Sequence, residues 1–297
     1  MKIGTVAVTG RANAGKSTLI NAIVGEKVSI VSPKPQTTRT AVRGIYNDNE
    51  SQIIFCDVPG VHNAKTGLGR EMIRAVNSEA FGADLVLFLL DGKNSRLTES
   101  EETLLNSLNR ENVPVILVIT KIDLYQKEKL LPVISEVTSR FEFETVIPIS
   151  AKRKDGVKIL IDEIKKYLYE GSPLYSEDEY TDMTMKEMLS ETIREKALLF
   201  LGEEIPHGIA VYITSFNEDD PEIIKATAEI YCEKKSHKAI IIGKGGNMLK
   251  KIAEEARKEA EKIFQTKIYL ECWVKVRENW RDNAKSLHEF GFVKNEN

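Results

Sequence analysis

The chain has 297 residues, of which 42% are hydrophobic, so it is long enough to fill two hydrophobic cores. Its net charge is −3, which excludes a nonspecific coat for nucleic acid. Cys56, Cys232 and Cys272 are too widely separated for a metal site or a disulfide framework, so we expect three buried thiols and a reducing cytoplasm. The sequence has no apolar run long enough for a membrane span and no secretory signal pattern.

The first part of the chain alternates short apolar runs with helical stretches. The runs are IGTVAVTG, QIIFCDVPG, DLVLFLLDG, VPVILVITK and ETVIPISA, and 98–110 is one of the helices expected between them. Runs that are apolar on both faces predict a parallel sheet covered by helices on both sides. AVRGIYN (41–47) is expected to add an antiparallel edge strand. We therefore predict an α/β domain with a mostly parallel, six-stranded sheet over residues 1–168.

The second part has a different order. Residues 169–184 are polar, acidic and rich in turn formers, which predicts a linker. Beyond it we expect a helix at 185–201, strands at GIAVYITSF and 223–234, an apolar strand at 239–242, a helix to 264 and the strand KIYLECWVKV. This order predicts an α+β domain over residues 185–297.

The segment GRANAGKS (10–17) matches the pattern of a phosphate-binding loop. It follows a predicted strand and opens a predicted helix, so its backbone N–H groups converge on a β-phosphate. Lys16 is placed to reach the β/γ oxygens, and the Ser17 hydroxyl to bind Mg²⁺. In IIFCDVPG, Asp57 is suited to hold Mg²⁺ through a water, and Gly60 offers a backbone N–H to a γ-phosphate.

Two further motifs indicate which base is bound. TKID (120–123) closes a predicted strand, and Asp123 can accept hydrogen bonds from guanine N1–H and from the exocyclic amine. Adenine offers no such pair, so the carboxylate would be left unpaired. SAK (150–152) closes the last strand, where backbone N–H groups can meet guanine O6. Motifs at four strand ends therefore predict a guanine-nucleotide site.

These motifs resemble the translation-factor class of P-loop GTPases over residues 1–168. The resemblance implies GTP or GDP with Mg²⁺ as ligands. It implies metal ligation by Ser17, Thr38 and Asp57, and nucleotide contacts from Gly10, Asn13, Ala14, Gly15, Lys16, Ser17, Thr18, Asp57, Pro59, Gly60, Thr120, Lys121, Asp123, Ser150, Ala151 and Lys152. Thr120 departs from the family, which has Asn there. We expect it to link the base loop to the phosphate loop without reaching guanine N7, which lowers nucleotide affinity.

The two switch segments of that class are also recognisable. SIVSPKPQTTRTAVRG (29–44) matches the first switch, in which Thr38 would sense the γ-phosphate and Mg²⁺. Thr37 is the alternative for this role. The other interpretation of the segment is a plain surface loop. In the second switch, Val61 stands where a Ras-like enzyme has the Gln that orients water, and His62 is either a base or a surface residue. We predict a slow GTPase whose catalytic residues are Lys16, Thr38 and Gly60.

A second glycine turn, GKGG (243–246), follows AIII and opens the helix NMLKKIAEEARKEAEKIF. A turn with so few side chains lets the backbone approach a phosphodiester chain. From 234 to 251 there are six lysines and no acidic residue, which indicates a local site for an RNA backbone. The alternative is a helix start with a solvated lysine face.

This second domain resembles a KH domain of type II, in which the Gly-x-x-Gly turn joins either two helices or a strand-like segment and a helix, and holds single-stranded RNA. With EEIPHGIAVYI (203–213) and WVKVRENWRDN (273–283), the whole chain resembles the Era GTPase family. The resemblance implies RNA contacts from Ile241, Ile242, Gly243, Lys244, Gly245, Gly246, Met248 and Lys250, with Arg277 and Arg281 as further phosphate contacts. Trp273 and Trp280 are expected to serve packing more than base stacking.

The family further implies a monomeric protein that binds the 3′ end of 16S rRNA and assists assembly of the 30S subunit. It also implies a peripheral contact with the inner membrane. Two other functions were weighed. An RNA-modifying enzyme would need a catalytic Cys, a metal cluster or a second cofactor loop in the second domain, and a membrane-surface signalling GTPase would need lipidation or a basic amphipathic helix.

Overall fold

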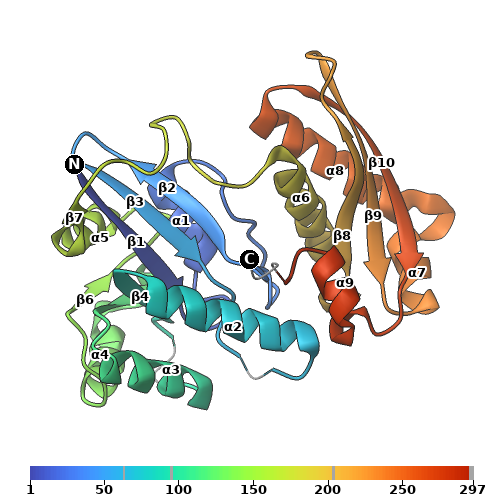
Figure 1. The fold of residues 1–297 in the computed structure, drawn as a ribbon. Helices are drawn as coiled ribbons and strands as arrows, with labels where there is room; N and C mark the ends of the chain where they lie inside the picture. Colours follow the sequence, from blue (N-terminus) through green and yellow to red (C-terminus); the bar gives the residue numbers. More distant parts are fainter. Residues whose placement is uncertain (63, 94–95, 203–204, 294–297) are drawn as a thin grey trace. The chain divides into compact units, whose positions relative to one another are not determined.

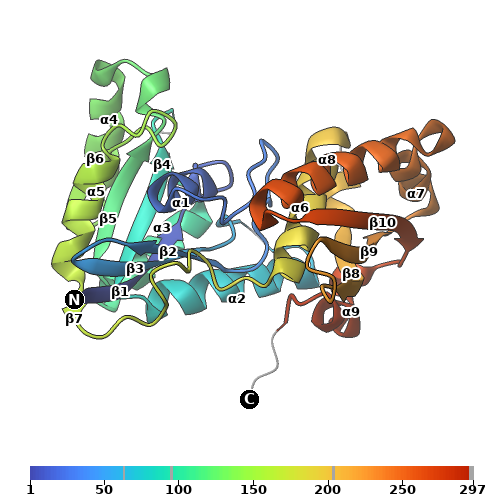
Figure 2. The same cartoon turned by 90° about the horizontal axis from the view of Figure 1, so that it is seen from above.

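The computed structural model describes residues 1–62, 64–93, 96–202 and 205–293. Glu203 and Glu204, at the start of the stretch that supports the KH likeness, lie outside these residues, as do Asn63 of the second switch and the last four residues of the chain. Contacts divide the chain into two compact units (Figures 1 and 2). The first contains Met1–Val31, Thr38–Ala64 and Met72–Asp182, and the second contains Ser32–Thr37, Lys65–Glu71 and Met183–Asn297.

The first unit is built on one sheet with strand order β2-β3-β1-β4-β5-β6, and the short β7 pairs with β1. Its strands are β1 (Lys2–Thr9), β2 (Val42–Asn47), β3 (Ser51–Asp57), β4 (Leu85–Asp91), β5 (Val115–Thr120), β6 (Thr145–Pro148) and β7 (Tyr169–Glu170). β1, β3, β4, β5 and β6 are parallel, and β2 is the antiparallel edge strand. The predicted mostly parallel sheet is confirmed.

Helices cover both faces of this sheet. They are α1 (Lys16–Val24), α2 (Gly67–Gly82), α3 (Glu99–Arg110), α4 (Lys127–Thr138) and α5 (Val157–Ile164). Alternate strand residues, such as Phe88 and Leu117, form one core with α2, α3 and α4. The residues between them, such as Leu87 and Val118, are equally buried, as the apolar runs predicted. Figure 1 shows α2 and α3 in front of the sheet and α1 behind it.

Most of the segment predicted as a linker, 169–184, packs on the first unit. Its start forms β7, Thr181 donates to the Arg43 carbonyl, and Gln52 accepts from the backbone N–H of Leu174 and Tyr175. The unit boundary therefore falls after Asp182, not after residue 168. The composition of the segment did not show that its backbone finds partners along the edge of the sheet.

The second unit has a three-stranded sheet with order β10-β9-β8 and helices on one face. Its elements are α6 (Met185–Phe200), β8 (Ala210–Asn217), β9 (Ile223–Cys232), α7 (Lys235–Ile242), α8 (Asn247–Phe264), β10 (Lys267–Val276) and α9 (Ala284–Glu289). A capping box at Thr184 and Glu187 starts α6. Leu189, Ile193 and Ile252 on the helices pack against Ile230 and Val274 on the strands.

One predicted element is wrong. The run at 239–242, expected to be a strand, is the end of helix α7, so the glycine turn joins two helices. A short apolar run does not distinguish strand from helix by its pattern alone. The structure resolves the matter, because the Gly243 N–H donates to the Ala239 carbonyl at 2.9 Å, a bond between residues four apart that defines an α-helix.

Among the described residues, no helix combines the length and the apolar character that a membrane span requires. Cys56 and Cys232 are buried as expected, whereas Cys272 is only half-buried.

Candidate nucleotide site and RNA groove

The phosphate-binding loop connects β1 to α1. Gly10 has φ +133°, and a Cβ there would lie 2.3 Å from the Leu89 carbonyl oxygen, so only glycine fits. Gly15 has φ +98° and is the N-cap of α1. The loop therefore directs the free N–H groups of the first turn of α1 toward the place where a phosphate would bind.

Lys16 lies folded across this loop. Its Nζ donates to the carbonyl oxygens of Gly10 and Arg11, both at 3.1 Å. Burial lowers the pKa of Lys16 to about 8, although the carboxylates of Asp57 and Glu101 oppose the shift. A buried cation held only by carbonyl oxygens is a strong partner for phosphate oxygens.

Three oxygen-bearing side chains meet beside the loop. Ser17 Oγ donates to Asp57 Oδ2 at 2.6 Å, and Thr38 Oγ1 lies 3.3 Å from the same oxygen and 3.2 Å from Ser17 Oγ. Asp57 Oδ1 is buried without a hydrogen-bond partner among the described residues, and burial raises the pKa of Asp57. Thr37 instead bonds the Lys34 carbonyl, so of the two threonines Thr38 is the one placed beside Ser17 and Asp57.

This donor set fits Mg²⁺, a hard cation that prefers hydroxyl, carboxylate and phosphate oxygens. Mg²⁺ bound there would neutralise charge on the phosphates of GTP. Ser17, Thr38 and Asp57 would hold it, and Lys16 would stabilise negative charge on the β/γ oxygens.

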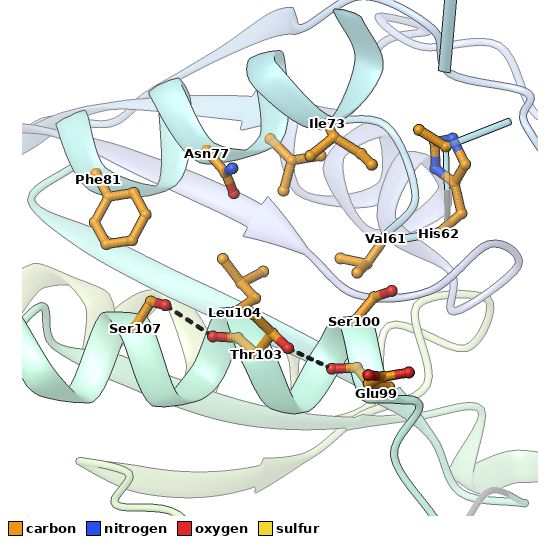
Figure 3. Close-up of a pocket in the computed structure, with 12 residues that line it drawn as sticks. Val61, His62, Ile73, Asn77, Phe81, Glu99, Ser100, Thr103, Leu104 and Ser107 are labelled. Atoms are coloured by element: carbon orange, nitrogen blue, oxygen red, sulfur yellow. Dashed lines mark hydrogen bonds between the residues drawn. The ribbon is translucent and has the colours of Figure 1, made fainter. Parts of the chain in front are cut away.

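A separate pocket of about 360 Å³ at the second switch shows where Val61 points. The side chains of Val61 and Leu104 face the space between α2 and α3, with His62 at one end (Figure 3). The Val61 N–H donates to the Gly10 carbonyl at 3.0 Å, which fixes this segment beside the phosphate loop. His62 Nδ1 donates to the Gly60 carbonyl at 2.7 Å. Val61 thus has neither the chemistry nor the direction to orient a water molecule.

The base pocket has a volume of about 240 Å³. It is lined by Gly15, Thr18, Thr120, Lys121, Asp123, Leu124, Ala151 and Lys152. Ser150 Oγ donates to Asp123 Oδ1 at 2.6 Å, and this bond lowers the pKa of Asp123. The carboxylate is therefore held ionised, as an acceptor for guanine N1–H and the exocyclic amine must be.

Two side chains tie the base loop to the phosphate loop. Thr120 Oγ1 donates to the Ala14 carbonyl at 2.7 Å, which is the link expected from Thr at this position. Lys121 Nζ donates to the Asn13 carbonyl and to Asp91, each at 2.7 Å. The two halves of the pocket are therefore connected by direct hydrogen bonds before any ligand is considered.

The glycine turn of the second unit is open. Gly243, Gly245 and Gly246 have φ of +73°, +61° and +79°, and a Cβ on Gly245 or Gly246 would meet nothing within 4 Å. Lys244, Lys250 and Lys251 are exposed around it. None of the six lysines between 234 and 251 forms an ion pair within the described part of the chain.

A groove of about 410 Å³ runs from this turn between α8 and β10. It is lined by Gly246, Leu249, Lys250, Ala253, Glu254, Arg257, Leu270 and Cys272. The groove has apolar residues together with the charged side chains Lys250, Glu254 and Arg257, and its apolar part suits unpaired bases while Lys250 beside the turn suits a phosphate.

Several residues expected at this groove lie elsewhere. Ile241 is fully buried in the core, and Ile242 and Met248 pack against that core. Arg277 forms a double hydrogen bond with Glu289, and Arg281 pairs with Glu233, and neither lines the groove. Their partners come from other elements, which sequence spacing could not show.

Two further residues at the sites were not predicted. Arg257 follows Lys250 by two helical turns on α8 and lines the same groove, where it also pairs with Glu261 at 2.7 Å. Arg11, inside the phosphate loop, makes a double hydrogen bond to the buried Glu101 of α3, at 3.0 and 2.7 Å. This pair fixes the loop from outside, and no local pattern indicates it.

Comparisons with known proteins agree with this architecture. The family model described as 50S ribosome-binding GTPase matches residues 5–121, and the KH domain model matches residues 204–281. GTPase Era of Ruminiclostridium cellulolyticum is 45% identical over 296 residues, which is 100% of this chain and 99% of that protein. GTPase Era of Caldicellulosiruptor saccharolyticus is 45% identical over 292 residues, 98% of this chain and 97% of that protein.

Two solved structures match over nearly the whole chain. A variant of Era from Aquifex aeolicus bound to GDP and aluminium fluoride has a TM-score of 0.94 at 40% identity, covering 99% of this chain and 100% of that one. Era in complex with MgGDPNP and nucleotides 1506–1542 of 16S ribosomal RNA also has a TM-score of 0.94, at 39% identity and the same coverage.

A P-loop GTPase domain followed by a KH domain defines a GTP-hydrolysing, RNA-binding protein that uses Mg²⁺. The chain belongs to the GTPase Era family.

Thr120 supplies the first prediction. Thr120→Val keeps the side-chain shape but removes the bond to the Ala14 carbonyl, and it should weaken GDP affinity about 5- to 10-fold. Thr120→Asn, which restores the family's residue, should strengthen affinity instead. Titration of a fluorescent GDP analogue measures both, and equal affinities in the two variants would contradict the role given to this link.

Val61 supplies the second prediction. The Val61 side chain points into the pocket between α2 and α3. Val61→Gln should therefore change the rate of single-turnover GTP hydrolysis, which is slow in the wild type, by less than about 3-fold. Thr38→Ala serves as a control that removes a metal ligand and should slow the reaction. A large acceleration by Gln would mean that the side chain reaches the phosphates.

Proposed function

We propose that this GTPase binds the 3′ end of 16S rRNA and acts as an assembly factor for the 30S ribosomal subunit. The observation that carries the proposal is the full-length similarity to Era solved with nucleotides 1506–1542 of 16S ribosomal RNA. The open glycine turn and the groove beside it supply a site of the required chemistry. Location in the cytoplasm is a further part of the proposal, supported by the cysteine pattern. A monomeric state and a peripheral membrane contact are parts of it that depend on family resemblance alone.

Within this function we assign the RNA backbone to Gly243, Lys244, Gly245, Gly246 and Lys250. A Cβ on Gly245 or Gly246 would meet nothing within 4 Å and the two lysines are exposed, so a phosphate chain can approach the turn closely. Half-buried Leu249, Leu270 and Cys272 are assigned to the bases. Lys16, Thr38 and Gly60 are assigned to hydrolysis, and the predicted nucleotide residues keep the roles given above.

The experiment that tests this function is crosslinking in cell extract, followed by sequencing of the bound RNA. The 3′ tail of 16S rRNA should dominate the recovered sequences. A Gly245→Asp, Gly246→Asp variant serves as the control for crosslinks formed elsewhere on the protein. Recovery of another class of RNA would refute the ribosomal proposal while leaving RNA binding intact.

The same double variant gives a third prediction, made in purified protein. Two carboxylates on the turn repel phosphates, so affinity for single-stranded RNA should fall at least about 10-fold while GTP binding stays unchanged. Gly245→Asn with Gly246→Asn is the matched control, because Asn has the same shape and tolerates positive φ. Filter binding compares the two, and RNA affinity retained in the Asp variant would remove the turn from the interface.

A fourth prediction concerns coupling between nucleotide and RNA. If GTP and RNA sites are linked, RNA affinity with a non-hydrolysable GTP analogue should differ at least about 5-fold from that with GDP, and RNA should shift nucleotide affinity by the same factor. Isothermal titration measures both sides of the cycle. Equal affinities would show that the two sites act independently.

A further inference from the structure

The sheet of the second unit has a face that no described helix covers along β10. Ile224, Ala228 and Ile230 of β9 and Ile268 and Val274 of β10 belong to the core with α6 and α8. Because strand side chains alternate, the residues between them point to the opposite side. We call this the outer sheet face, formed by Lys225, Thr227, Glu229 and Tyr231 of β9 and Lys267, Tyr269, Glu271, Trp273 and Lys275 of β10.

Two large aromatic side chains stand on this face. Tyr269 is 55% exposed and Trp273 is 60% exposed. They lie four residues apart on the same side of an edge strand, with Glu271 between them. Trp280, by contrast, is fully buried and donates to the Gly208 carbonyl at 3.0 Å. The expectation of packing therefore applies to Trp280 and not to Trp273.

Part of the same face is already covered. Phe290, just after α9, packs on Tyr231 with ring centroids 4.8 Å apart, and Arg277 lies over both rings. This covered end is opposite the β8–β9 hairpin, as Figure 1 shows. Tyr269 and Trp273 have no ring contact of this kind among the described residues. Exposed Trp and Tyr next to covered surface are typical of an interaction site.

The negative charge of this side of the domain lies in the β8–β9 hairpin, whereas the strands themselves carry Glu229 and Glu271 against Lys225, Lys267 and Lys275. The β8–β9 hairpin contains Glu218, Asp219, Asp220 and Glu222, all exposed and none in an ion pair within the described residues. Lys225, near the start of β9, is paired with Tyr269 across the two strands. Counting the hairpin, the outer sheet face with its strand neighbours has six acidic residues against Lys225, Lys267 and Lys275, and Lys275 is paired with Glu229.

This charge is opposite in sign to that of the glycine turn, where six lysines occur without an acidic residue. An RNA strand is favoured at the turn and repelled by the hairpin. Guanidinium and ammonium groups instead suit this surface. They form ion pairs with carboxylates and stack on exposed aromatic rings. The two sides of this domain thus suit partners of opposite charge.

We propose that the outer sheet face and the hairpin bind an extended, arginine- and lysine-rich segment of a partner protein. Trp273 and Tyr269 stack on its guanidinium groups, and Glu218, Asp219 and Glu222 pair with its positive charges. The surface binds such a segment whichever RNA occupies the groove.

The test uses the full chain and a fluorescein-labelled peptide of alternating Arg and Ala, about twelve residues long, enough to cross the sheet. Anisotropy titration should show saturable binding, about 3-fold weaker for the matching Lys-Ala peptide. Tyr269→Ala with Trp273→Ala should weaken Arg-Ala binding at least about 10-fold. No saturable binding, or equal binding by this variant, would overturn the proposal.

Charge is tested with a matched pair of variants. Glu218→Gln, Asp219→Asn and Glu222→Gln together should weaken binding about 10-fold and flatten its salt dependence. Glu111→Gln, Glu136→Gln and Glu142→Gln remove the same charge from the first unit and should change affinity less than about 2-fold. Equal losses in both variants would mean nonspecific attraction and would contradict the proposed surface.

Two further measurements separate other occupants. Without peptide, the Tyr269→Ala, Trp273→Ala variant should bind single-stranded RNA with the affinity of wild type. Loss of RNA affinity would assign the face to RNA and refute the proposal. Sedimentation should show the same mass for wild type and this variant, and self-association lost in the variant would assign the face to a second copy and refute the proposal. An unchanged circular dichroism spectrum and melting temperature in every variant confirm that the second unit is folded.

Discussion

The nucleotide site depends on one geometric constraint, which is that parallel strands end at the same edge of their sheet. β1 leads into the phosphate loop, β3 ends in Asp57, β5 ends in Thr120 and β6 leads to Ser150. Four segments that are far apart in the sequence therefore meet without any dedicated scaffold. The hydrogen bonds from Thr120 to Ala14 and from Ser150 to Asp123 then fix their relative positions.

Both ligand sites use glycines to expose backbone, but they do so in different settings. Gly10 is required because the Leu89 carbonyl occupies the space of a Cβ, whereas Gly245 and Gly246 are surrounded by open space. The first loop is thus packed closely against the sheet. The second is a surface turn that a long polymer can approach from outside. This difference matches a nucleotide pocket in one unit and an RNA groove in the other.

Much of this could be predicted from sequence, for identifiable reasons. The strands of the first unit are apolar on both faces, so β3 and β4 appear in the sequence as continuous apolar runs. Motifs at the ends of β1, β3 and β5 place Ser17, Asp57 and Asp123. Predictions failed where the answer depends on long-range partners. Arg277 was expected to contact RNA, but it is paired with Glu289 of α9. The four apolar residues at 239–242 do not show whether they form a helix or a strand.

The direction of the Val61 side chain, beside the phosphate loop, is another feature that the sequence could not predict. Sequence shows that no Gln follows Gly60, but only the structure shows that the side chain lies between α2 and α3. The exposure of Trp273 is likewise invisible in the pattern of β10, where it occupies an outward position like Tyr269 and Glu271. Side-chain direction, and not residue type, decides which of these residues has a partner inside the fold.

The central claim is that the two glycine loops bind two different ligands. Backbone amide NMR of the full chain tests it most directly, with GDP and Mg²⁺ added first and single-stranded RNA second. We expect GDP to shift the amides of residues 10–17 and RNA to shift those of 243–246. RNA that leaves the amides of Gly245 and Gly246 unchanged while shifting others would contradict the account.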